Sequence, residues 1–125
     1  MSKDSSVLFP HRTPHEARRR LTDDLERWGD LFVRVAREGT VEAAEQILGG
    51  LVDWMGNGLI DGWLCLPIPL FERISDLAEE LFLACQGYLG RLSAVPPPLS
   101  AAERASHEGA IREILSRARA LAEGE

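Results

Sequence analysis

The chain has 125 residues, of which 45% are hydrophobic, and this is the size and composition of one globular domain with a single core. Its formal net charge is −6, and no Lys or Arg occurs between Arg37 and Arg73, which argues against a continuous cationic surface for nucleic acid. The longest apolar stretch is interrupted by Asp, Gly and Pro, and the first residues lack the form of a signal peptide, so we predict a cytoplasmic protein without a membrane span.

The first predicted helix begins at Thr13 and ends at Gly39. Thr13 and Glu16 have the spacing of a capping box, in which each side chain bonds to the backbone N–H of the other residue. Gly39 is expected to end the helix in the left-handed conformation that glycine adopts readily. The apolar residues recur at steps of four and three, which predicts one buried stripe: Ala17, Leu21, Leu25, Trp28, Phe32, Val35 and Ala36.

The second predicted helix begins after Thr40, a capping residue, and ends at the Gly-Asn-Gly run of residues 56–58. Gly49 and Gly50 lie in its middle. Because each internal glycine costs about 1 kcal/mol relative to alanine, we expect the pair to allow close approach of another backbone.

The third predicted helix starts near Pro69 and stops before the three prolines at 96–98. Its apolar face is wider than one stripe, so we expect it to be the central helix of the fold. A second capping box, Ser100 with Glu103, begins the last helix. The inner face of that helix is predicted from spacing as Ile111, Ile114, Leu115, Ala118, Leu121 and Ala122.

These elements predict an all-α fold, a four-helix bundle-like single domain over residues 13–123 that follows a flexible arm of residues 1–12. An irregular Gly/Trp/Pro crossover, residues 56–69, is expected between the second and third helices. Strand-like alternation occurs only at 59–66, which is too short and isolated to form a sheet.

The Arg-Arg-Arg run at 18–20 raises the question of nucleic-acid binding. Three acid–base pairs at a spacing of four residues favour a solvated helix face instead: Glu16–Arg20, Asp23–Arg27 and Asp30–Arg34. The last helix repeats this pattern with Glu108–Arg112 and Glu113–Arg117. Arg18 has no acid three or four residues away, so the candidates for nucleic-acid contact are Arg12, Arg18 and Arg19, with Arg117 and Arg119 as additions.

No motif for catalysis, for a cofactor or for a metal is present. His11 and His15 are four residues apart, but Pro14 separates them and no third ligand is in view, so we predict two solvent-facing side chains. His107 is expected to form an exposed pair with Glu103. The acidic row Glu72, Asp76 and Glu80 should face water or a basic partner, and Cys65 and Cys85 are predicted to be free thiols. We therefore expect a protein that is not an enzyme.

The most informative segment is residues 54–71, with one charge in eighteen positions. Its large apolar side chains either plug one end of the bundle or form an exposed docking patch. The candidate partner-binding residues are Trp54, Trp63, Leu66, Ile68 and Phe71, beside a further Leu64. Asp53 and Asp61 at the rim would suit a partner that presents apolar groups beside a base.

The sequence thus predicts a non-catalytic helical interaction protein, a small subunit or self-associating module of a larger assembly, with a protein partner or a second copy as ligand. Two alternatives remain open. One is a small helical subunit of a ribonucleoprotein, such as a CRISPR-type effector complex, that contacts nucleic acid. The other is an acidic immunity or inhibitor protein that covers a basic toxin surface.

Overall fold

The structure is a computed structural model, and it describes residues 13–94 and 99–123. Within these residues the chain forms four long helices and one short one, which confirms the predicted all-α, bundle-like fold. The helices are α2 (Pro14–Glu38), α3 (Val41–Asn57), α4 (Ile60–Cys65), α5 (Ile68–Ser93) and α6 (Ala101–Ala122). The predicted arm, residues 1–12, lies outside the described residues. None of the described helices combines the length and the apolarity needed to cross a membrane.

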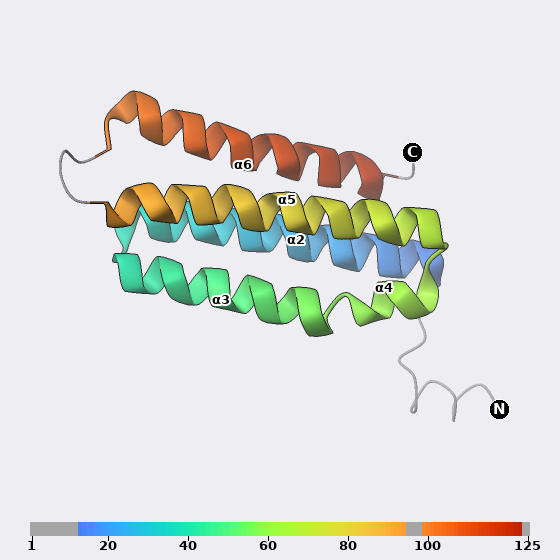
Figure 1. Ribbon diagram of the computed structural model, residues 1–125. Coiled ribbons are helices and arrows are strands. Elements are labelled where there is room, and N and C mark those ends of the chain that lie inside the picture. The colour runs from blue at the N-terminus through green and yellow to red at the C-terminus, as the bar shows by residue number, and fades with distance from the viewer. Residues whose placement is uncertain (1–12, 95–98, 124–125) are drawn as a thin grey trace.

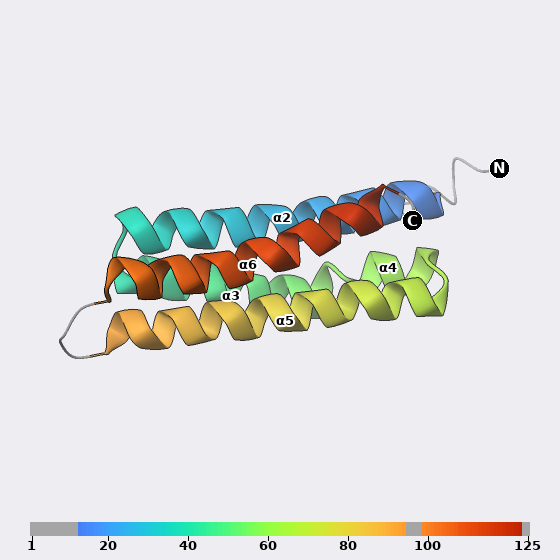
Figure 2. The same cartoon turned by 90° about the horizontal axis from the view of Figure 1, so that it is seen from above.

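Helices α2 and α5 lie side by side in the middle of the bundle (Figures 1 and 2). Helix α6 covers the groove between them on one side, while α3 and α4 cover the opposite side (Figure 2). Consecutive long helices run in opposite directions, as expected for short connections. Both α2 and α5 contact each of the other long helices, so the central role predicted for the third long helix is shared by α2.

The helix starts follow the predicted caps. The Thr13 hydroxyl accepts a hydrogen bond from the Glu16 N–H, and the Glu16 carboxylate accepts one from the Thr13 N–H, both at 3.1 Å. Ser100 and Glu103 form the same reciprocal pair. The prediction for Gly39 was wrong, because this residue has an extended backbone (φ −106°). A Cβ there would lie 2.9 Å from the Val35 carbonyl oxygen, so glycine supplies space rather than left-handed geometry.

The crossover is more regular than predicted, because residues 60–65 form the short helix α4. Gly62 lies on its inner side, where an added Cβ would be 2.7 Å from Leu21 of α2 and 2.8 Å from Phe71 of α5. The missing side chain lets α4 lie directly against both central helices. The neighbouring residues Leu59 and Leu66 are buried and anchor the two ends of this helix.

A second close approach joins α2 and α3. An added Cβ on Gly50 would lie 2.6 Å from the Trp28 ring, so the glycine accommodates an indole and not, as predicted, another backbone. Gly49 is exposed, and nothing lies within 4 Å of the position its Cβ would take. The two adjacent glycines therefore have different roles. Only Gly50 is required by the packing.

We predict opposite effects for alanine at these two positions. Gly50→Ala should lower the free energy of unfolding by about 1–3 kcal/mol, because the rigid Trp28 ring cannot yield without moving the helices. Gly49→Ala should raise the free energy of unfolding by up to about 1 kcal/mol, because alanine favours the helix and meets no neighbour. Urea denaturation followed by circular dichroism measures both. Equal effects of the two substitutions would contradict the assigned packing.

Candidate functional site

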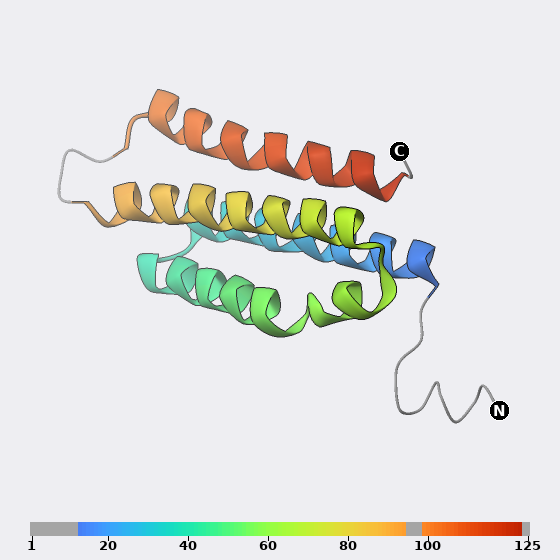
Figure 3. The same ribbon diagram turned by 45° about the vertical axis from the view of Figure 1, so that its right-hand side comes forward.

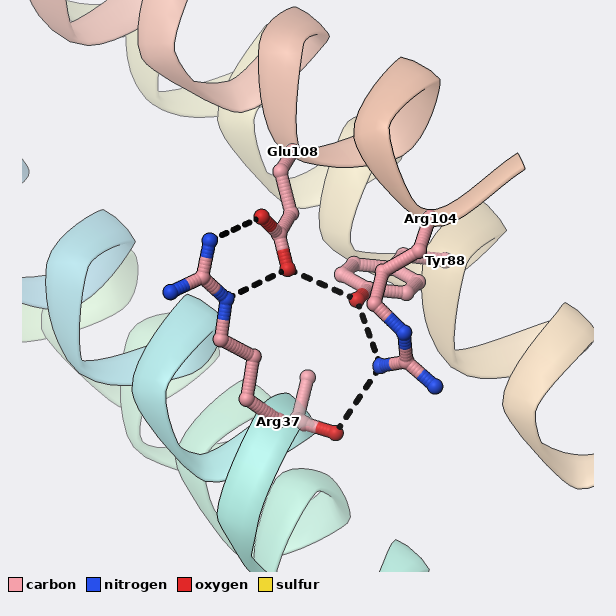
Figure 4. Close-up of polar contacts among 5 residues, drawn as sticks. Arg37, Tyr88, Arg104 and Glu108 are labelled. Carbon is pink, nitrogen blue, oxygen red and sulfur yellow. Dashed lines mark hydrogen bonds and ion pairs between the residues drawn. The ribbon is translucent and has the colours of Figure 1, made fainter. Parts of the chain in front are cut away.

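The most elaborate polar arrangement is an interhelical cluster around Glu108 of α6, which is 5% exposed (Figure 4). Arg37 of α2 donates two hydrogen bonds to the carboxylate, from Nε to Oε2 at 3.0 Å and from Nη2 to Oε1 at 2.7 Å. The hydroxyl of Tyr88 on α5 donates to Oε2 at 3.1 Å. Arg104 of α6 donates a hydrogen bond to the Tyr88 hydroxyl. We call these four residues the polar cluster: Arg37, Tyr88, Arg104 and Glu108.

Tyr88 is the centre of this arrangement. Its side chain is fully buried, and its hydroxyl oxygen accepts a hydrogen bond from Nη1 of Arg104 at 3.1 Å. The ring stacks on the half-buried His107 imidazole, with centroids 5.0 Å apart and an interplanar angle of 3°. The Tyr88 ring also meets the Phe32 ring edge-on, with ring centroids 6.0 Å apart. One side chain of α5 thereby contacts residues of α2 and α6 together.

The buried carboxylate of the polar cluster is paired within the fold by Arg37. The hydrogen bonds from Arg37 lower the pKa of Glu108, although burial opposes this shift, and the Tyr88 hydroxyl adds to the lowering. Burial raises the pKa of Tyr88, while the hydrogen bond from Arg104 opposes that rise. At neutral pH the carboxylate is ionised and the phenol is neutral. We interpret the cluster as a structural link, because its hydrogen bonds join α2, α5 and α6.

Two sequence predictions were wrong at this place. Glu108 was expected to form an exposed pair with Arg112, and His107 was expected to pair with Glu103. Glu108 is instead buried against α2 and α5, and the Glu103 carboxylate caps α6 and accepts a hydrogen bond from Arg91 at 3.0 Å. A signal for this burial exists in the sequence. Glu108 lies three residues before Ile111, on the same stripe as the apolar inner face.

A different kind of surface lies on α4 and at the start of α5. Four large apolar side chains are exposed there, and we call them the α4 patch: Ile60 (56%), Trp63 (62%), Leu64 (60%) and Ile68 (60%). The Trp63 ring meets the half-buried Phe71 ring edge-on, with centroids 5.7 Å apart. Phe71 follows Ile68 by three residues on α5, so the two residues are neighbours on one face of that helix.

The five predicted partner-binding residues differ in their exposure to water. Trp63 and Ile68 are exposed in the α4 patch, and Phe71 is half-buried under it. Trp54 packs against the core, and its indole N–H donates to the Asp24 carboxylate at 3.0 Å. Leu66 is 8% exposed and belongs to the core, so it is not available to a partner in this conformation. The segment therefore contributes some residues to the core and others to an exposed apolar surface.

The sequence prediction left Ile60 out of the candidate residues and did not group Leu64 with it. The reason is that the segment was expected to be irregular. Once α4 is a helix, Ile60, Trp63 and Leu64 have the one-face spacing of three and four residues. Ile68 then extends the same surface onto α5.

The arginine run has a mixed environment. The six charges predicted for the wet face of α2 are all exposed, but the predicted pairs do not form among the described residues, where Glu16 caps the helix and Arg20 lies 4.0 Å from Asp24. Arg18 is half-buried, and its Nε is enclosed without a hydrogen-bond partner. Arg19 is exposed, and Arg12 lies outside the described residues.

The remaining arginines of the predicted nucleic-acid surface are already paired. Arg117 forms ion pairs with Glu80 of α5 and with Glu113, and Arg119 forms one with Glu26 of α2 at 2.6 Å. The basic partner expected for Glu80 is thus supplied by the chain itself. These pairs reduce the cationic character of the α6 end.

The thiols and the histidines add no further site. Cys65 is half-buried and Cys85 is buried, and both are free thiols. Burial raises the pKa of Cys85 to about 12, which makes this thiol a poor nucleophile at neutral pH. His15 is exposed, and its predicted companion His11 lies outside the described residues. Among the residues that the structure describes, no three His, Cys, Asp or Glu side chains come together as metal ligands would.

Comparison with known proteins gives no family for this chain. A scan against protein-family models and searches of curated proteins and of solved structures found no match. The candidate sites are therefore defined by geometry alone. The polar cluster lies toward the end of the bundle where α2 and α5 finish, and the α4 patch lies at the end where α5 begins (Figures 1 and 3).

We predict that the polar cluster contributes a pH-dependent part of the stability. Glu108→Gln should lower the free energy of unfolding at pH 7 by about 1–3 kcal/mol, because the buried ionised acceptor of Arg37 and Tyr88 is lost. The folded-state pKa of Glu108 is lowered, so its contribution is complete above the unfolded value of about 4.3 and disappears as the pH falls through the folded value.

The difference between the wild type and Glu108→Gln should therefore shrink below about pH 4. Urea denaturation at several pH values measures this difference. Glu113→Gln, an exposed change on the same helix, is the matched control and should alter stability by less than about 0.5 kcal/mol. If the loss of stability caused by Glu108→Gln stayed constant from neutral to acidic pH, this would contradict the ionised state assigned to Glu108 in the folded protein.

Proposed function

We propose that this protein is a non-catalytic helical interaction module, a small subunit of a larger assembly that binds a protein partner through the α4 patch. The observation that supports this proposal is the exposure of Ile60, Trp63, Leu64 and Ile68, each more than half accessible to water. Single exposed apolar residues are ordinary in folded proteins. Four large ones occur here on α4 and the first turn of α5, and such a concentration is typical of interaction sites.

The composition of the patch fits a docking surface. Tryptophan is enriched among the residues that dominate binding energy, and the exposed Trp63 ring contacts the Phe71 ring edge-on. The scaffold beneath is fixed, because Leu59, Leu66 and Gly62 hold α4 against the two central helices. A partner would therefore meet a preorganised surface, which reduces the ordering cost of binding.

The charges near the patch favour a partner that is basic. Glu72 is exposed one turn after Ile68, and Asp53 is exposed near the end of α3. No Lys or Arg occurs from residue 38 to residue 72. A short amphipathic helix with an apolar stripe flanked by Lys or Arg matches this surface in both shape and charge. A basic toxin surface, as in the immunity-protein alternative, would have the same chemistry.

Nucleic acid receives less support as a ligand. Arg18 and Arg19 have no carboxylate partner among the described residues, but Arg117 and Arg119 are both engaged in ion pairs. The exposed apolar side chains lie on α4 and α5, in the stretch of sequence that carries no cation before Arg73. Phosphate binding requires clustered free cations, which this surface does not offer.

We predict selective binding of a basic amphipathic peptide. The probe is a synthetic helical peptide with a leucine stripe and lysines on its polar face, and the comparison peptide carries glutamates in place of the lysines. The lysine peptide should shift the indole N–H resonance of Trp63 in a two-dimensional NMR titration and bind at least about tenfold more tightly than the glutamate peptide. Trp63→Phe identifies the resonance.

The chain offers a matched pair of control variants. Leu64 in the patch and Leu83 on α5 are both exposed leucines, at 60% and 58%. Leu64→Asp should weaken binding of the lysine peptide at least about tenfold, whereas Leu83→Asp should change it less than about twofold. Equal losses from both variants would indicate unspecific adhesion. That result, or the failure of both peptides to bind, would overturn the proposed function.

A further inference from the structure

The groove between α2 and α5 has a ligand in the structure itself, because α6 of the same chain lies in it (Figure 2). We propose that this groove is a second binding surface, and that it takes the α6 of a second copy as well as its own. Two chains that exchange their α6 helices form a reciprocal dimer that keeps the helix contacts of the monomer. The inference goes beyond the proposed function, because it does not involve the α4 patch.

Four ion pairs fasten α6 to the two central helices. Two of them join α6 to α2 and two join it to α5: Arg37–Glu108, Glu26–Arg119, Arg91–Glu103 and Glu80–Arg117. Because two pairs go to each neighbour, charged contacts flank the buried apolar residues of α6 on both sides. The groove therefore recognises α6 by charge at its edges as well as by apolar contact at its floor.

The groove has the same order of charges on both edges. On α2, the acid Glu26 precedes the base Arg37 by eleven residues. On α5, the acid Glu80 precedes the base Arg91 by the same interval. Eleven residues are about three helical turns, so each acid shares a face with its base at a separation of about 16 Å. Since α2 and α5 run in the same direction, the acids lie toward one end of the groove and the bases toward the other (Figure 1).

Helix α6 has the complementary order of charges. Its contacting acids, Glu103 and Glu108, precede its contacting bases, Arg117 and Arg119, and it runs opposite to α2 and α5. The acids of α6 thus meet the bases of the groove, and its bases meet the acids. A helix placed in the reverse direction would bring like charges together, which is unfavourable. The charge order therefore selects the direction and the register of α6, so the groove is specific for this helix.

Helix α6 can leave the groove while the other helices keep their mutual contacts. It packs against α2 and α5, whereas α2, α3 and α5 also pack against one another. Its first turn is capped by Ser100 and Glu103, and within the helix Glu113 forms an ion pair with Arg117. Local interactions of this kind stabilise a helix without a neighbour. The exchange therefore moves a largely preformed element.

A second copy is the ligand that matches both the charges and the apolar residues of α6. The apolar residues that it buries are Ile111, Ile114, Leu115, Ala118 and Leu121. When α6 leaves its own groove, these side chains contact water, so they favour entry into an identical groove. Residues 94–100 join α5 to α6, and so short a connection gives a chain's own α6 a local concentration in the millimolar range. A second copy competes as the protein concentration approaches that range.

Charge reversal tests the exchange in the full chain. The groove variant carries Glu26→Arg with Glu80→Arg, and it opposes like charges between its groove and its own α6. The helix variant carries Arg117→Glu with Arg119→Glu, and it does the same with the opposite sign. In a reciprocal dimer of the two variants, both grooves receive a helix of matching charge. Each variant changes the formal net charge of −6 by four, so both stay negative and bulk attraction does not draw them together.

Light scattering measures the outcome. The mixture should reach twice the monomer mass at a protein concentration at least about tenfold below the one that the wild type requires. Each variant alone should remain monomeric at this concentration. A mixture that keeps the monomer mass would overturn the inference. Doubling of the mass in either variant alone would also overturn it, because association would then not follow the charge match.

A variant with all four substitutions is the matched control. It restores the charge match within one chain, so it should resist urea better than either two-substitution variant and stay monomeric when mixed with the groove variant. If a two-substitution variant alone does not fold, the mixture should recover the helical circular dichroism that this variant lacks. A four-substitution variant that regains no stability would contradict the assigned charge order and with it the inference.

The wild type supplies an independent readout. Its share of doubled mass should rise with protein concentration toward the millimolar range and fall again on dilution, and Leu64→Asp should not alter this share. A wild type that stays monomeric throughout would overturn the inference. Loss of the dimer in Leu64→Asp would assign association to the α4 patch instead. The peptide titration that tests the proposed function is unaffected by either result.

Discussion

The ionised carboxylate of Glu108, enclosed among three helices, constrains the arrangement of the whole bundle. A buried charge is tolerated only where donors neutralise it, and here Arg37 comes from α2 while Tyr88 comes from α5. Apolar stripes can slide past one another with modest loss, whereas these hydrogen bonds exist in one register only. The position of α6 over the groove between α2 and α5 depends on these hydrogen bonds. The His107 and Phe32 rings contact Tyr88 and help to fix the same position.

The structure of the opposite end of the bundle depends on the length of α3, which is shorter than α2 and α5. Helix α3 ends at Asn57, well before the level at which α5 begins, and the chain fills the remaining space with the six residues of α4. One narrow face of so short a helix is enough to hold it, because Gly62, Leu59 and Leu66 occupy that face. Its other large side chains, Ile60, Trp63 and Leu64, stay exposed, although the Trp63 ring contacts Phe71 at its edge. The α4 patch is thus a consequence of how the bundle is completed.

The two ends have complementary properties. At one end, the Glu108 carboxylate and the Tyr88 hydroxyl are buried and hydrogen-bonded within the fold, so they are suited to rigidity and offer little to a ligand. At the other end, apolar groups are exposed on a firmly held support, so they are suited to contact. A rigid scaffold that presents an apolar surface loses little conformational entropy when it binds a partner. The proposed interaction module rests on the exposed end of this division.

The sequence by itself determined the features that depend on neighbours within a few residues. Capping boxes at Thr13 and Ser100, helix periods and proline stops are local, and they were sufficient for the all-α fold and the four long helices. Only the tertiary structure decided the environments of Glu108 and Trp63. Glu108 is buried and Trp63 is exposed because of what the other helices place beside them. Such contacts join residues far apart in the chain, so the spacing of Glu108 from Ile111 indicates an inward position but does not identify Arg37 and Tyr88 as its partners.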